Sequence, residues 1–90
     1  MKKNFVVVSE KGIHARPATE LVIVADQFMS EIKVTANNRT IDMKSIMGLM
    51  SLGMYRGQSF TLEINGGDEQ LAMEKIKNLL IENGLAKIDE

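Results

Sequence analysis

The segment 12–19 holds the residues of this chain best suited to chemistry, in the order GIHARPAT. It contains the only histidine, His14, and the only proline, Pro17, on either side of Arg16. Pro17 is compatible with a helix only in the first turn, because further in it would remove a backbone hydrogen bond. His14 or Ala15 is therefore expected close to the N-cap of a helix.

A histidine at a helix start lies beside backbone N–H groups that have no intrahelical partner. Neutral imidazole is a nucleophile, and this position favours the neutral ring and an anion next to it. A phosphoryl group on His14 could accept hydrogen bonds from the N–H groups of Ala15 and Arg16, and the Arg16 guanidinium can bind phosphate oxygens in a fork. The segment thus predicts a reversible phosphoryl acceptor. The residues alone leave open that His14 only caps a helix or fills a turn.

A second candidate site is the stretch 43–54, which contains four of the seven methionines. Ser45 is predicted to cap a short helix that reaches about Leu52 and ends at Gly53. A short helix cannot turn so many apolar side chains inward, so the excess predicts an exposed patch for protein partners, with methionines filling the core as the alternative. A phosphate on Ser45 would be tolerated beside the helix dipole, although capping alone also explains this serine.

The other elements are predicted from hydrophobic periodicity. A β-branched run predicts a strand over 5–8, and alternation predicts strands over 31–36 and 59–64. The turn composition of residues 37–39 predicts that 40–43 return as an antiparallel strand. Asp68 is expected to cap a last helix that ends just before Gly84. Helical stripes are formed by Ala18, Leu21, Val22, Ala25, Phe28 and Met29 in the first long helix and by Ala72, Ile76, Leu79 and Leu80 in the last. The order βαββαβα indicates an α+β fold, an open-faced two-layer sandwich with an antiparallel sheet and helices on one face.

The composition of the chain disfavours several other classes of function. The formal net charge of -1 predicts no sequence-wide attraction to nucleic acid or to an anionic membrane. No run approaches the roughly 20 apolar residues of a membrane span, and the N-terminal apolar run is too short for a signal peptide, so a cytoplasmic protein is expected. No metal or cofactor is expected, since there is no cysteine and no second histidine. Residues 1–90 are expected to form a single domain.

Two long motifs then allow a comparison with a known family. With GIHARPAT at 12–19 and KSIMGLMSLG at 44–53, the chain resembles over essentially its whole length the HPr family of Gram-positive type. These are histidine-containing phosphocarriers of the bacterial phosphoenolpyruvate-dependent sugar phosphotransferase system. The resemblance implies a four-stranded sheet of order 1-4-2-3 with three helices on one face.

The resemblance also implies roles for single residues. His14 would take a phosphoryl group on Nδ1 from phosphorylated enzyme I and pass it to the IIA domains of sugar permeases, with Arg16 stabilising the phosphate. Ser45 would be the regulatory site of HPr kinase/phosphorylase, and the modified protein would be corepressor of the catabolite control transcription factor. The surface that docks partners would be formed by Arg16, Ile46, Met47 and Met50. Such a protein is a carrier and not an enzyme, and we expect a monomer that exposes its patch to several partners in turn.

The sequence alone leaves other functions open. An interaction module controlled only through Ser45, with His14 inactive, would share the methionine-rich patch. A metal carrier or RNA binder fits badly, because the chain has no Cys-x-x-Cys motif and no basic, aromatic-rich strand. Many relatives carry Ser or Thr at the position of Lys11, and this lysine could add attraction for phosphate or alter the choice of partner.

Overall fold

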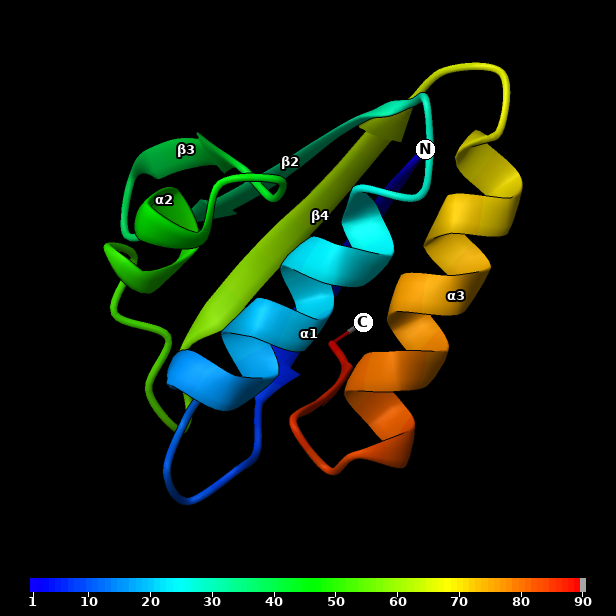
Figure 1. The fold of residues 1–90 in the computed structure, drawn as a ribbon. Helices are drawn as coiled ribbons and strands as arrows, with labels where there is room; N and C mark the ends of the chain where they lie inside the picture. Colours follow the sequence, from blue (N-terminus) through cyan, green and yellow to red (C-terminus); the bar gives the residue numbers. More distant parts are fainter. Residues whose placement is uncertain (90) are drawn as a thin grey trace.

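Within residues 1–89, which the computed structural model describes, five strands form one sheet and three helices cover one of its faces (Figure 1). The elements in chain order are β1 (Lys2–Val7), α1 (Ala15–Ala25), β2 (Glu31–Ala36), β3 (Arg39–Asp42), α2 (Ile46–Met50), β4 (Ser59–Asn65), α3 (Glu69–Glu82) and β5 (Ala86–Ile88). The expected α+β open-faced sandwich is confirmed. No helix in this part of the chain is long and apolar enough to cross a membrane.

The strands lie in the order β3-β2-β4-β1-β5, and each neighbouring pair is antiparallel. The first four strands have the expected order 1-4-2-3, but the expectation of only four strands is wrong. After α3, Gly84 adopts a φ of 63°, and residues 86–88 then pair with β1 at the edge of the sheet. Three residues are too few for an alternating pattern to be visible, so β5 has no clear signal in the sequence.

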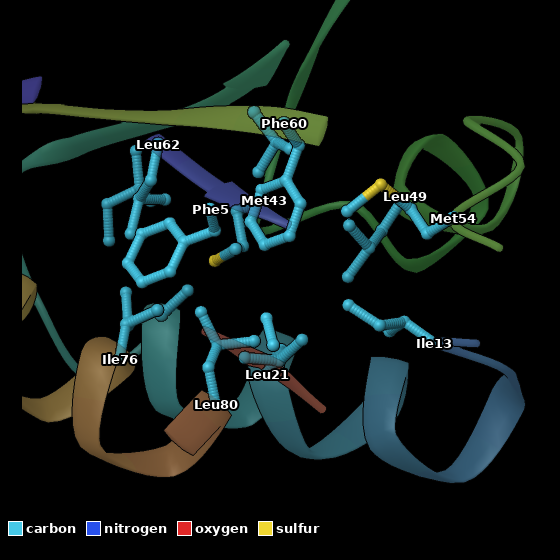
Figure 2. Close-up of a cluster of buried hydrophobic side chains, with 14 of the residues drawn as sticks. Phe5, Ile13, Leu21, Met43, Leu49, Met54, Phe60, Leu62, Ile76 and Leu80 are labelled. Atoms are coloured by element: carbon cyan, nitrogen blue, oxygen red, sulfur yellow. The ribbon is translucent and has the colours of Figure 1, made fainter. Parts of the chain in front are cut away.

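The core lies between the sheet and the helices, where alternate strand residues meet the helical stripes. Phe5 on β1 and Phe60 on β4 are stacked, with ring centroids 5.3 Å apart. Figure 2 shows Leu21 of α1 and Ile76 and Leu80 of α3 pointing toward these strands. All five side chains are buried, and full burial of one such side chain stabilises the fold by about 1.5–3 kcal/mol. This packing fixes where α1 lies on the sheet and hence where its first turn begins.

Helix α1 is shorter than the predicted helix, because it ends at Ala25 and not near Met29. Phe28 is still buried, but Met29 is 92% exposed and takes no part in the apolar stripe. The loop that follows the helix is held by a set of hydrogen bonds to a distant residue. The Asp68 carboxylate accepts from the N–H groups of Met29 (2.9 Å) and Ser30 (3.0 Å) and from the Ser30 hydroxyl. These bonds hold the chain in a loop where periodicity alone predicts helix.

Asp68 is the N-cap residue of α3, as expected, but its side chain makes no capping hydrogen bond. The carboxylate instead joins the start of α3 to the loop after α1. The hydrogen bond from the Ser30 hydroxyl, followed by the one from the Met29 N–H, lowers the pKa of Asp68 below its usual value. A carboxyl with a lowered folded-state pKa stabilises the fold above its unfolded pKa, and this stabilisation is lost as the pH falls through the folded pKa.

We therefore expect Asp68→Asn to lower the urea midpoint at pH 7 and to flatten its decline in acid. The decline should flatten because the variant no longer has this carboxyl to protonate. Circular dichroism at pH 7 and pH 3 measures both effects. Asp26→Asn, at the exposed C-cap of α1, is the matched control. If both variants lose stability equally at pH 7, the tether assigned to Asp68 is contradicted.

Candidate functional site

His14 is the N-cap residue of α1, as the sequence indicated. Its backbone is extended (φ -93°, ψ -165°), and its carbonyl accepts the Ala18 N–H at 2.9 Å. The imidazole makes no capping hydrogen bond and is exposed. The ring is thus free of any local capping task, which weakens the alternative that His14 only caps the helix.

The chain immediately before His14 is held tightly. Ile13 is buried, and its N–H donates to the Met54 carbonyl at 2.8 Å. Figure 2 shows Ile13 beside Met54 and Leu49, below α2. Gly12 has a φ of 68°, and a Cβ at this position would clash with the Met54 carbonyl oxygen. The loop after α2 therefore fixes the backbone that presents His14.

The start of α1 offers two backbone donors next to the imidazole. Helix geometry leaves the N–H groups of Ala15 and Arg16 without intrahelical acceptors. Pro17 is the third residue of the helix and has no N–H, and the N–H of Ala18 is used by the His14 carbonyl. The first turn also contains no acidic residue. An anion attached to the ring would therefore meet two open donors and the positive end of the helix dipole.

A shallow surface hollow of about 300 Å³ surrounds this turn, and it is lined by His14, Arg16, Pro17, Glu20, Asn83 and Leu85. The structure thus brings together His14 and Arg16, the two residues predicted for this site. Lys11 is exposed but is not among the lining residues. The other side of the hollow comes from the turn between α3 and β5.

Sequence reasoning missed three lining residues. Glu20 lies four residues after Arg16, so helical spacing could have placed the two side chains on one face. Asn83 and Leu85 carry no local signal, because only the packing of α3 beside α1 brings them to the hollow.

Ser45 is the N-cap of α2, as predicted. Its hydroxyl oxygen accepts the Gly48 N–H at 3.1 Å, and the side chain is exposed. The helix stops at Met50 and not near Leu52. Just beyond the helix, the carbonyl of Ser51 accepts from Arg39 (2.9 Å) and that of Leu52 accepts from Asn37 (2.7 Å), so side chains hold the segment that follows. Lys44, next to Ser45, donates to the Phe28 carbonyl at 2.7 Å and holds the loop after α1.

The methionine-rich stretch divides between core and surface. Met43 and Met54 are 1% and 5% exposed, whereas Met47 and Met50 are 80% and 48% exposed. With Ile46, which is also exposed, these last two form an apolar surface that we call the α2 patch. Figure 1 shows α2 and the first turn of α1 on the same side of the molecule, with α3 on the other. A protein bound at the α2 patch would therefore lie close to His14.

The open-faced sandwich, with an exposed histidine at the start of α1, places the chain in the class of small α+β phosphocarriers. The family model described as PTS HPr component phosphorylation site matches residues 1–82. The chain belongs to this family, the HPr phosphocarriers of the phosphotransferase system.

Individual relatives agree with this assignment. The chain is 44% identical over 85 residues to the phosphocarrier protein HPr of Lysinibacillus sphaericus, covering 94% of this chain and 97% of the relative. Its fold matches the histidine-containing phosphocarrier protein from Mycoplasma with a TM-score of 0.93 and 32% identity, covering 97% of this chain and 99% of the other. It also matches Crh, the catabolite repression protein of Bacillus subtilis, whose structure is a swapped, intertwined dimer. That match has a TM-score of 0.73 and 39% identity, and covers 86% of this chain and 88% of the other.

Proposed function

We propose that His14 accepts a phosphoryl group from phosphorylated enzyme I and passes it to the IIA domains of sugar permeases. The observation that carries this proposal is the exposed ring of His14, which makes no capping bond and lies beside two open N–H donors at the start of α1. Nδ1 of the neutral ring attacks phosphorus as the bond from phosphorus to the donor breaks, and the donor leaves with the electron pair. The acceptor repeats this displacement on the phosphorylated chain, so no water takes part.

Arg16 is proposed to stabilise the transferring group. Arg16 lines the same hollow as His14, and a guanidinium can bind two phosphate oxygens at once. Phosphoryl transfer needs positioning and charge stabilisation more than covalent chemistry from the protein. The chain is itself modified in each cycle and needs both donor and acceptor proteins, so it is a carrier and not an enzyme. It would act as a monomeric single domain in the cytoplasm, without a cofactor.

The direct test is incubation of the chain with enzyme I and phosphoenolpyruvate, followed by mass spectrometry. We expect one acid-labile phosphate, located on His14 by fragmentation and lost when a IIA domain is added. A folded chain that takes no phosphate from active enzyme I would overturn the proposal.

The α2 patch is proposed to dock these partners. We expect Met47→Asp to raise the KM for the chain as acceptor from enzyme I about 30-fold, because a charge in an apolar interface costs about 2 kcal/mol or more. The helix should persist, since Met47 is 80% exposed. Met29→Asp is the matched control, because Met29 is still more exposed and lies beyond the far end of α1. Equal effects of the two substitutions would contradict a specific patch.

Ser45 is proposed as a regulatory phosphorylation site, modified by HPr kinase/phosphorylase. The hydroxyl is exposed at a helix start next to the α2 patch, and the similarity to Crh, a catabolite repression protein, favours this regulation. The modified chain would then bind the catabolite control transcription factor. We expect Ser45→Ala to abolish labelling by the kinase and ATP, whereas Ser51→Ala, at the other end of α2, should be labelled normally. Labelling of the Ser45→Ala chain would place the modification elsewhere.

The same observations favour a second candidate, an interaction module controlled through Ser45 alone. It shares the α2 patch and the likeness to Crh, and it differs only in having no transfer at His14. Sugar uptake in cells carrying each variant separates the two functions. Loss of uptake with His14→Ala supports the carrier, and loss only with Ser45→Ala supports the interaction module.

A further inference from the structure

The hollow at His14 combines charges of opposite sign. The positive charge comes from the Arg16 guanidinium and from the start of α1. The negative charge comes from the Glu20 carboxylate and from the C-terminal end of α3, where Asn83 is the C-cap residue. A site built only to hold a phosphate tightly would lack these two sources of negative charge.

The C-terminal end of α3 is the negative end of a helix dipole, and its last turn contains no basic residue. The Leu79 carbonyl accepts from the Asn83 backbone (3.2 Å) and side chain (2.8 Å), and the Leu80 carbonyl accepts from the Leu85 N–H at 2.9 Å. These bonds fix the conformation of the turn whose residues Asn83 and Leu85 line the hollow.

Glu20 is the one acidic side chain among the residues that line this hollow. It is exposed, and none of the ion pairs found within residues 1–89 involves it. It lies four residues after Arg16, so both side chains leave the same face of α1. A phosphoryl group on His14 would therefore share the hollow with a carboxylate that takes part in none of these ion pairs.

We infer that Glu20 raises the phosphoryl-transfer potential of His14. This inference rests on the proposed carrier function. A phosphoryl group adds about two negative charges, and repulsion by the carboxylate raises the free energy of the phosphorylated chain more than that of the free chain. Phosphate taken from the donor is then held less tightly and is given up more readily to the acceptor. Glu20 acts through space on the phosphoryl group and takes no part in the bond changes.

The test is the equilibrium constant of phosphoryl exchange between enzyme I and the chain, obtained from the phosphorylated fractions of both proteins by mass spectrometry. We expect Glu20→Gln to shift this constant about three- to tenfold toward the phosphorylated chain, and added salt to reduce the shift. A role of Glu20 in docking would change the rates of approach to equilibrium in both directions but not the constant. Glu74→Gln is the control, because Glu74 is exposed on α3, pairs with Lys77 and does not line the hollow.

An unchanged constant in Glu20→Gln, with wild-type chain that is phosphorylated normally, overturns the inference and leaves the carrier function standing. The same shift in Glu74→Gln also overturns it, because the effect would then be one of net charge. Wild-type chain that never takes phosphate overturns the carrier function and this inference together.

Discussion

His14→Ala should abolish phosphoryl acceptance from enzyme I while the protein stays folded. The chain has no other histidine, so no second imidazole can replace the nucleophile. The His14 side chain is exposed and makes no capping bond, so its removal should change the free energy of unfolding by no more than about 0.5 kcal/mol. Acid-labile phosphate per chain, measured by mass, checks the first effect, and the urea midpoint checks the second.

An acid-labile phosphate on the His14→Ala chain would show that another residue is the acceptor. A large loss of stability would show that the ring has a structural role that the geometry of α1 does not reveal. The expected pair of results, no phosphate and a native midpoint, separates chemistry from folding.

Arg16→Ala should lower the rate of phosphoryl transfer at saturating enzyme I about 100-fold, the usual cost of removing one donor that stabilises developing charge. Arg16 lines the hollow beside His14, and its side chain is exposed, so the fold should be unaffected. The transfer rate of Arg16→Lys should lie between those of the wild-type chain and Arg16→Ala, because lysine keeps the charge but cannot bind two oxygens in a fork. Rapid-quench single-turnover kinetics measures the rate.

Arg56→Ala is the matched control for this effect. Arg56 is exposed, pairs with Glu10 at 4.0 Å and does not line the hollow. Its removal should leave the saturated transfer rate unchanged. If the rate falls equally in both variants, positive charge acts at long range, and the forked contact assigned to Arg16 is contradicted.

Local patterns in the sequence were sufficient to place His14 and the first four strands, although β1 runs from Lys2 to Val7 and not over the predicted 5–8. Pro17 restricts the start of α1, and alternation in β2 and β4 shows which side of each strand is buried. These signals are local, because each depends on a few neighbouring residues. The same is true of Ser45, whose position before a short helix is enough to predict a cap.

The features that sequence reasoning missed depend on contacts between distant residues. The loop after α1 is held by Asp68, whose carboxylate accepts from residues 29 and 30, and this contact has no periodic signature. Strand β5 exists because β1 offers it an edge. Asn83 and Leu85 reach the hollow only because α3 packs beside α1. Local propensity is overridden in each case by a tertiary hydrogen bond or by packing.

A phosphoryl group on His14 should be held by the open N–H groups at the start of α1. Two-dimensional ¹⁵N NMR of the chain before and after phosphorylation by enzyme I and phosphoenolpyruvate tests it most directly. We predict that the backbone amide signals of Ala15 and Arg16 move most, while those of Ser45 and Gly48 stay in place. A fully phosphorylated chain whose Ala15 and Arg16 signals do not move would contradict the account.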